Sequence, residues 1–274
     1  AEGNVALKVS ASETETDAFE VAGRGELQLG ILIETMRREG FELTVGRPRV
    51  VFRFDDATGE KQEPVEEIII DVDDAYAGIV VQKLSQRRAV LKDMRPSGHG
   101  RQRLAFLAPT RGLIGYQSEL LTDTRGTAIL NRLFHSYAPY HGEISSRHTG
   151  VLLSNGDGEA VAYALFNLQD RGAMFIDPGT RVYAGMIVGE HTRGNDLELN
   201  VLKGKKLTNI RAAGKDDAVL LTPPVRMTLE RALAYIADDE LVEVTPRSIR
   251  LRKKLLDPHL RKRAGRGPRA DNAA

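Results

Sequence analysis

The residues best suited to do chemistry lie in one basic segment of the sequence, over residues 200–217. Between Leu202 and Lys215 the chain carries five basic residues and no acidic one: Lys203, Lys205, Lys206, Arg211 and Lys215. Gly204 and Gly214 interrupt the segment, and neither helical nor strand periodicity continues across it. A cationic loop of this kind is suited to bind an anion such as phosphate, although a solvated loop without a partner has the same composition. We expect the segment to be poorly ordered alone and to become ordered on RNA.

A second set of cations accompanies the glycines of predicted turns. Arg95, His99, Arg101 and Arg103 cluster on one hairpin tip, and Arg111 marks another turn beside Gly112. The tail from Arg247 to Arg269 adds ten Lys/Arg against one acid, Asp257. Together these groups predict a discontinuous phosphate-binding surface, although arginines on exposed turns are common without one. Because aromatic residues are few, we expect recognition of backbone and shape in structured RNA rather than base stacking.

Other chemistry finds little support in the residues. No G-x-x-x-x-G-K-[ST] phosphate loop is present, and the spacing of the six histidines matches no metal motif. The amides of Gly23-Arg24-Gly25 could hold an anion, but a plain strand-to-helix turn explains these glycines better. His135, Ser136 and Asp123 suggest a hydrolytic set, yet no nucleophile elbow places the serine. The absence of cysteine excludes disulfides and thiolate chemistry.

The elements that must position these residues follow from hydrophobic periodicity. Residues 62–143 read as β-α-β-β-α-β, the split βαβ order of a ferredoxin-like fold, with four antiparallel strands and two helices on one face. In this interpretation Asp74 caps the first helix, and Ala77 and Gly78 let that helix approach the sheet. Residues 1–61 read as β-β-α-β, a ferredoxin-like unit without its first strand and helix.

The remaining residues, 144–274, predict a mostly β domain with a short helix, the basic segment and the basic tail. Gly150–Ser154 and Ala160–Ala164 resemble a hairpin around the turn at residues 155–158. Residues 165–171 suggest a short helix. Thr228 is a predicted N-cap for a helix over residues 229–237, and two strands follow around Pro246. The tail from Leu260 is expected to fray. The whole chain is therefore predicted to be α+β: two tandem ferredoxin-like domains followed by a mostly β domain.

Length and charge fit this organisation. The chain has 274 residues, which is enough for two or three domains, and its formal net charge of +1 indicates no partner by itself. No apolar stretch is long enough to span a bilayer, and no signal-peptide pattern begins the sequence. These features predict a cytoplasmic protein without a membrane partner.

Three stretches carry a resemblance to a known family. Gly23-Arg24-Gly25-Glu26-Leu27-Gln28-Leu29 resembles the G-x-G-E-L-H-L segment of domain III in elongation-factor-G-like translational GTPases, with Gln28 where histidine is usual. Residues 108–116, Ala-Pro-Thr-Arg-Gly-Leu-Ile-Gly-Tyr, resemble domain V of the BipA (TypA) family. Residues 203–209, which include Thr208 and Asn209, and residues 223–230 resemble the C-terminal domain distinctive of that family.

The resemblance implies the C-terminal half of a ribosome-associated GTPase. GTP or ppGpp would bind an upstream G domain, so no cofactor and no enzymatic activity are expected in these residues. The implied partners are the ribosome, with rRNA of both subunits and the A-site tRNA, and the implied state is a monomer. The implied role is large-subunit assembly and translation control linked to stress, cold and virulence. Alternatives are another elongation-factor-like GTPase of the LepA or elongation factor G type, a protein-binding adaptor without RNA contact, or a hydrolase.

Overall fold

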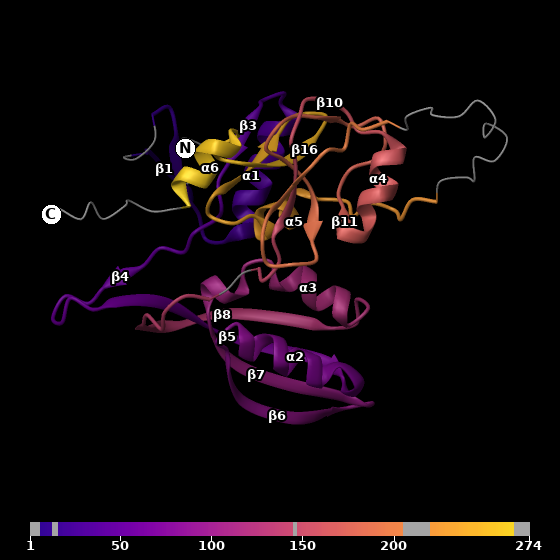
Figure 1. The fold of residues 1–274 in the computed structure, drawn as a ribbon. Coiled ribbons are helices and arrows are strands. Elements are labelled where there is room, and N and C mark those ends of the chain that lie inside the picture. The colour runs from indigo at the N-terminus through magenta and orange to yellow at the C-terminus, as the bar shows by residue number, and fades with distance from the viewer. Residues whose placement is uncertain (1–5, 13–15, 145–146, 205–219, 266–274) are drawn as a thin grey trace, which may run out of the picture. The chain divides into compact units, whose positions relative to one another are not determined.

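The computed structural model describes residues 6–12, 16–144, 147–204 and 220–265, and it divides into two compact units. Unit 1 comprises residues 1–29 and 48–146, and unit 2 comprises residues 30–47 and 147–274. Both contain helices and sheets, which confirms the predicted α+β class (Figure 1). Helix α1 (Glu26–Arg38) begins in unit 1 and ends in unit 2.

The main sheet of unit 1 has the strand order of a split βαβ fold. Its elements follow in the chain as β5 (Lys61–Asp73), α2 (Asp74–Gln86), β6 (Val90–Gly98), β7 (Arg101–Pro109), α3 (Tyr116–Asp123) and β8 (Ile129–Pro139). Strand β5 pairs with β7 and β8, and β6 pairs with β7, all antiparallel. The short strand β4 (Arg53–Phe54) extends the sheet at the start of β5. The four antiparallel strands predicted for this part of the chain are thus confirmed.

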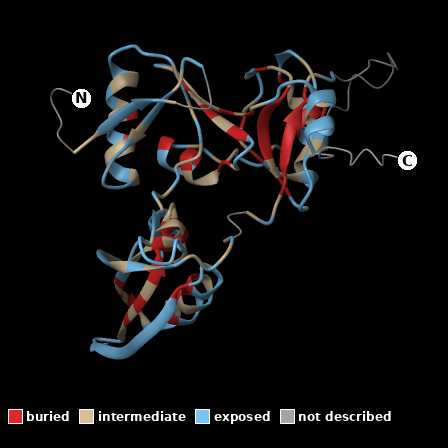
Figure 2. Cartoon of the chain, turned by 90° about the vertical axis from the view of Figure 1, so that its left-hand side faces the viewer, coloured by how far each residue is buried: buried red, intermediate tan, exposed pale blue. Residues whose placement is uncertain are grey.

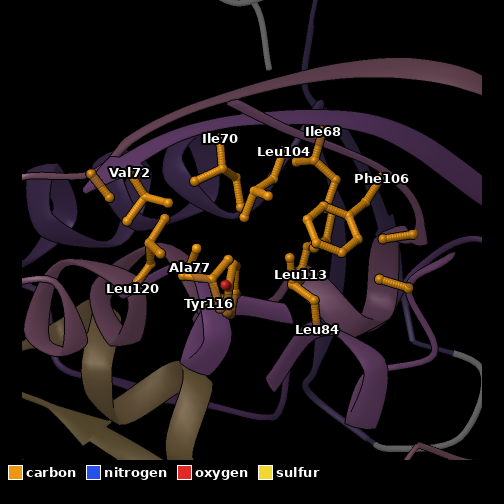
Figure 3. Close-up of a cluster of buried hydrophobic side chains, with 14 residues drawn as sticks. Ile68, Ile70, Val72, Ala77, Leu84, Leu104, Phe106, Leu113, Tyr116 and Leu120 are labelled. Atoms are coloured by element: carbon orange, nitrogen blue, oxygen red, sulfur yellow. The ribbon is translucent and has the colours of Figure 1, made fainter. Parts of the chain in front are cut away.

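Alternation along β5 explains why one face of this sheet is covered. Ile68, Ile70 and Val72 are buried, whereas the intervening residues are more exposed. The buried side chains pack with Leu104 and Phe106 of β7 and with residues of α2 and α3, which therefore share that face (Figure 3). The core members drawn from the helices are Ala77, Val80 and Leu84 of α2 and Tyr116 and Leu120 of α3.

Two details of α2 differ from the sequence prediction. Asp74 is the first helical residue, and the N-cap Asp73 makes no side-chain capping bond. Ala77 is buried as expected, but Gly78 is exposed and no atom lies within 4 Å of the place where its Cβ would stand. The close approach of helix and sheet therefore depends on Ala77 alone.

The first residues of the chain do not form a ferredoxin-like sheet among the described residues. Strands β1 (Lys8–Ala11) and β2 (Phe19–Ala22) pair with each other in a two-stranded sheet. Strand β3 (Leu43–Val45) instead pairs with β15 of unit 2, with Val45 opposite Val242. The α1 prediction is confirmed, and the helix ends two residues before Gly40, whose φ of +96° suits glycine.

The main sheet of unit 2 has two adjacent strands that are buried on both faces. Its order is β14-β9-β13-β16-β15-β3, with β11 also paired to β13. The strands are β9 (Val151–Ser154), β11 (Gly172–Met174), β13 (Met186–His191), β14 (Leu197–Leu199), β15 (Glu240–Val244) and β16 (Ile249–Lys253). Every residue of β9 is buried, because Val151 and Leu153 face one core and Leu152 faces another. Buried parts of the strands are drawn in red in Figure 2.

Two helices of unit 2 pack against these cores. Helix α5 (Leu229–Tyr235) supplies Leu229, Ala232 and Leu233 to the first core, and α4 (Ala162–Leu168) supplies Leu165 to the second. Thr228 caps α5 as predicted, since its Oγ1 accepts a hydrogen bond from the amide of Arg231 at 3.3 Å. Strands β10 (Gly158–Glu159) and β12 (Arg181–Val182) form a small separate sheet, and α6 (Pro258–Ala264) ends the described chain.

Two predictions for this part of the chain were wrong. Strand β9 forms no hairpin with residues 160–164, which instead enter α4, and β9 pairs with β13 and β14. The tail is helical to Ala264, because Asp257 caps α6 through the amides of His259 and Leu260.

Candidate nucleic-acid interface

The predicted RNA-binding residues fall into two groups, one in each unit. Arg95, His99, Arg101, Arg103 and Arg111 belong to unit 1, and Lys203 belongs to unit 2. The other predicted residues lie outside the described part of the chain: Lys205, Lys206, Thr208, Asn209, Arg211 and Lys215. The expectation that the basic segment orders on RNA falls on the same undescribed residues.

In unit 1 the β6–β7 hairpin carries four of these residues at its tip. Arg95 lies opposite Arg103, and the turn at His99 has a φ of +52° between two glycines that also have positive φ. Arg95 and His99 are exposed, and the Nε of Arg95 lies 3.7 Å from a carboxylate oxygen of Asp93. The hairpin therefore presents Arg95 and His99 to solvent, as the sequence predicted for a surface cluster.

Two further arginines fasten this tip to β5. Arg103 donates from Nε and Nη2 to both carboxylate oxygens of Asp71, each at 2.9 Å. This pairing lowers the pKa of Asp71 below its usual value. Arg101 donates from Nη2 to the carbonyls of Asp71 and Thr127, at 3.0 and 2.9 Å. Arg101 and Arg103 thus hold the hairpin in place, whereas Arg95 and His99 are the predicted residues at its tip that are exposed.

Arg111 is placed inside unit 1. Its guanidinium donates to both carboxylate oxygens of Glu63 and to the carbonyl of Gly142, and it lies 4.7 Å from the ring centre of Tyr140. Glu63 is itself buried and also accepts from the amide of His141. Arg111 therefore compensates an internal carboxylate, and no local pattern in the sequence predicts this pairing.

In unit 2 the basic segment is preceded by a packed anchor, formed by Val201 and Leu202, which we call the first root. Val201 is fully buried, and its carbonyl accepts from the amide of Val161 at 3.0 Å. Leu202 packs across Gly158, where an added Cβ would lie 3.1 Å from a methyl carbon of Leu202. Lys203 follows directly and is exposed. The first cation of the segment therefore stands one residue beyond a packed anchor.

After the basic segment, the described chain resumes at a second root, which contacts the end of helix α4. The amide of Thr222 donates to the side-chain oxygen of Gln169, which follows α4, at 3.1 Å. Next, the amide of Val225 donates to the carbonyl of Met174 at 2.8 Å. Both ends of the basic segment are thus fixed around α4, which begins three residues before the short helix predicted over residues 165–171. The spacing of Ala164, Leu165 and Leu168 is its helical signal.

The basic tail is partly built into unit 2 by a buried charge network. Lys253 is 3% exposed, and its Nζ lies 2.7 Å from Asp196, 2.8 Å from Asp239 and 2.9 Å from Glu240. Glu240, with no exposed side-chain surface, also receives both Nη atoms of Arg147 at 2.8 and 3.0 Å. Burial by itself lowers the pKa of Lys253, but the carboxylates outweigh it and raise that pKa above its usual value.

The remaining candidate residues from the sequence form local hydrogen bonds and ion pairs in the structure. The amide of Arg24, in the Gly23–Gly25 turn, donates to the side-chain oxygen of Gln28 at 2.8 Å. Asp123 forms an ion pair with Lys83 at 2.7 Å, while His135 bonds the adjacent Ser136. Within the described ranges no cluster of three His, Cys, Asp or Glu residues is arranged to hold a metal. No helix among them is both long and apolar enough to cross a membrane.

Comparison with known families divides the chain into two matches. Residues 60–148 match the elongation factor G C-terminus, and residues 149–258 match the TypA/BipA C-terminal domain. The boundary at residue 148 falls two residues beyond the segment of unit 1 that ends at residue 146.

Curated relatives match almost the whole chain. A protein of Escherichia coli K12 named large ribosomal subunit assembly factor BipA is 56% identical over 98% of this chain and 44% of its own length. Proteins of the same name from Haemophilus influenzae and Synechocystis are 53% and 50% identical, over 96% and 92% of this chain and 42% of their own length. The chain thus spans less than half the length of these relatives.

Proposed function

Because the chain belongs to the BipA (TypA) family, we propose that it is the ribosome-binding part of a large ribosomal subunit assembly factor. The relatives that carry this name match 92–98% of the chain, and the family-specific domain over residues 149–258 contains the basic segment. The proposal therefore assigns RNA contact first to residues 203–215. The β6–β7 hairpin supplies a second contact through Arg95 and His99.

The observation that supports this most directly is the way unit 2 presents the basic segment. Both roots are anchored by backbone amides on either side of α4, and the sequence between them has five cations and no acid up to Lys215. Phosphate contacts dominate nucleic-acid affinity, so a cation-rich segment with fixed ends suits rRNA or tRNA. A packed domain gains nothing from five like charges placed together without an anion.

The finer parts of the proposal concern the whole protein. We expect it to be a cytoplasmic monomer that hydrolyses GTP on the ribosome, touching rRNA of both subunits and the A-site tRNA. GTP or ppGpp would bind outside the present residues, since these contain no phosphate loop. We also expect residues 1–61 to belong to a ferredoxin-like domain III, residues 62–143 to form domain V, and residues 144–274 to form the family-specific domain. A role in stress, cold and virulence responses belongs to the same proposal.

Ribosome co-sedimentation across a salt series tests the proposed contact. Five neutralised phosphates should contribute about four units to the slope of log affinity against log salt. Replacing Lys203, Lys205 and Lys206 with Glu should weaken binding strongly and reduce that slope by about two to three units. The melting temperature should barely change, because solvated side chains contribute little to stability.

A matched charge reversal on the tail provides the control. Arg247, Lys262 and Arg263 are exposed, and replacing them with Glu changes the net charge by the same amount. If the tail variant loses ribosome binding while the segment variant sediments like the parent, the tail is the contact. If neither variant differs from the parent at any salt concentration, the adaptor without RNA contact replaces the proposed function.

A further inference from the structure

Helix α4 exposes two aromatic side chains on the face turned away from its core. Ala164 and Leu165 are buried, and Leu168 packs against the same core. Tyr163 and Phe166, three residues apart, are 39% and 40% exposed. Residues at this spacing are neighbours on a helix surface, so the two rings form one outward patch. A short helix that needed only to cover the core would not require aromatic side chains on its solvent face.

The position of α4 links this patch to the basic segment. The residue before the helix, Val161, donates its amide to the carbonyl of Val201, at the first root. The residue after it, Gln169, accepts the amide of Thr222, at the second root. The helix therefore joins the two points between which the basic segment leaves and re-enters unit 2 (Figure 1). RNA with a phosphate at Lys203, two residues beyond Val201, comes close to the first turn of α4.

The charges around the patch favour bases over backbone phosphates. Asp170 is exposed one turn beyond Phe166 and repels a phosphate placed on α4. Lys203, at the first root, attracts one at the side of the helix. Aromatic rings bind nucleobases of any sequence by stacking, because every base has a π face. The arrangement thus matches RNA with a phosphate at Lys203 and unpaired bases against the rings.

We propose that Tyr163 and Phe166 form a stacking surface for unpaired RNA bases, beside the segment that binds the backbone. The proposal rests on the proposed function and adds base recognition to it. It also replaces the expectation, drawn from the low aromatic content, that recognition involves backbone and shape alone. The occupant is a single-stranded stretch or a splayed-out end of a structured RNA, because bases inside a duplex are not free to stack on protein.

Fluorescence anisotropy with two labelled RNAs tests this. One probe is an unstructured strand of about twelve nucleotides, within the site size of single-strand binders, and the other is a closed hairpin of the same length. Tyr163→Leu combined with Phe166→Leu should weaken binding of the unstructured strand by about fivefold to a hundredfold for each base lost. The salt slope should stay unchanged, since no charge is removed. Tyr163→Phe keeps a ring and should bind like the parent.

The control variant is Phe41→Leu, which alters another exposed aromatic residue of unit 2 and should leave both probes unaffected. If the double variant binds the unstructured strand as tightly as the parent, the stacking surface is refuted. If that variant also loses ribosome binding, the patch contacts a protein instead of RNA. If the Lys203, Lys205 and Lys206 charge reversal still weakens binding in that case, the proposed function survives. If the parent binds neither probe nor ribosomes, both fail together.

Discussion

Replacing Lys253 with methionine tests how unit 2 is held together. Lys253 comes from the sequence's basic tail, yet it is buried at the end of β16 among Asp196, Asp239 and Glu240. Methionine has nearly the same length and removes only the charge. Removing one partner of a buried ion pair leaves an uncompensated charge and destabilises by about 3–5 kcal/mol.

The structure places the expected cost at the lower end of this range. Asp239 is 67% exposed, so its pairing contributes little. Glu240 has no exposed side-chain surface, but it keeps Arg147 at 2.8 Å after the substitution. The loss then comes mainly from weaker compensation of Glu240 and from Asp196, which gives about 3 kcal/mol. At 2–4 °C per kcal/mol, the melting temperature of unit 2 should fall by roughly 6–12 °C.

Differential scanning calorimetry measures this loss, and a lysine of unit 1 provides the matched control. Lys83 forms ion pairs with Glu119 and Asp123 but is partly exposed, so Lys83→Met should cost about 1 kcal/mol or less. The Lys253→Met variant should lower a transition that Lys83→Met leaves in place. An unchanged melting temperature for Lys253→Met at neutral pH would refute the view that Lys253 compensates buried carboxylates.

The pH dependence of the stability loss provides a second test of this prediction. Burial alone raises the pKa of Asp196, but Lys253 and the amide of Val151 outweigh it and hold the pKa below its usual value. Stability from Asp196 is therefore present above its unfolded pKa of about 3.9 and is lost as pH falls through the lower folded pKa. The variant lacks the part of this contribution that comes from Lys253, so the difference in unfolding free energy between the parent and the variant should narrow below about pH 4. A difference that grows in acid would contradict the assignment.

Two further predictions follow from single contacts, and a third follows from the missing phosphate loop. Arg111→Ala leaves the buried Glu63 without its cation and should destabilise unit 1 by about 3–5 kcal/mol in chemical denaturation; a loss under about 1 kcal/mol would mean that water replaces the guanidinium. Thr228→Ala removes the cap of α5 and should cost about 1 kcal/mol, whereas Thr228→Ser should cost little; equal melting curves for all three proteins would count against the cap. The chain should bind no GTP in calorimetry, and a measurable binding heat would disprove this.

Local patterns predicted the parts of the fold that local physics decides. The alternation of β5 and the helical spacing of α2 identified these elements of unit 1, because residues within one short stretch of sequence form each buried face. Thr228 identified the start of α5 for the same reason, since an N-cap bonds only to the next turn. These elements needed no information from distant parts of the chain.

The failures lie where distant residues decide. Residues 160–164 contain a short apolar run that fits a strand or a helix, and contact with Val201 and Met174 places it in α4. Arg111 looked like a free surface cation because its partner Glu63 lies 48 positions away in the sequence. Side-chain pairing over such separations has no local signal in the sequence. The sequence therefore identified the cations but not which of them are paired with carboxylates.

This distinction ranks the two basic regions as RNA contacts. The tail from Arg247 to Arg269 has ten cations in the sequence, but Lys253 is enclosed by carboxylates, Arg252 pairs with Glu243 at 2.8 Å and Arg261 pairs with Glu198 at 2.9 Å. Each such pair removes a charge that would otherwise release counterions from RNA. The segment from Leu202 to Lys215 has no acid of its own, and its first cation, Lys203, is exposed beyond a packed root. Charge reversal in the segment should therefore weaken ribosome binding more than the matched reversal on the tail, although the tail has the larger number of basic residues.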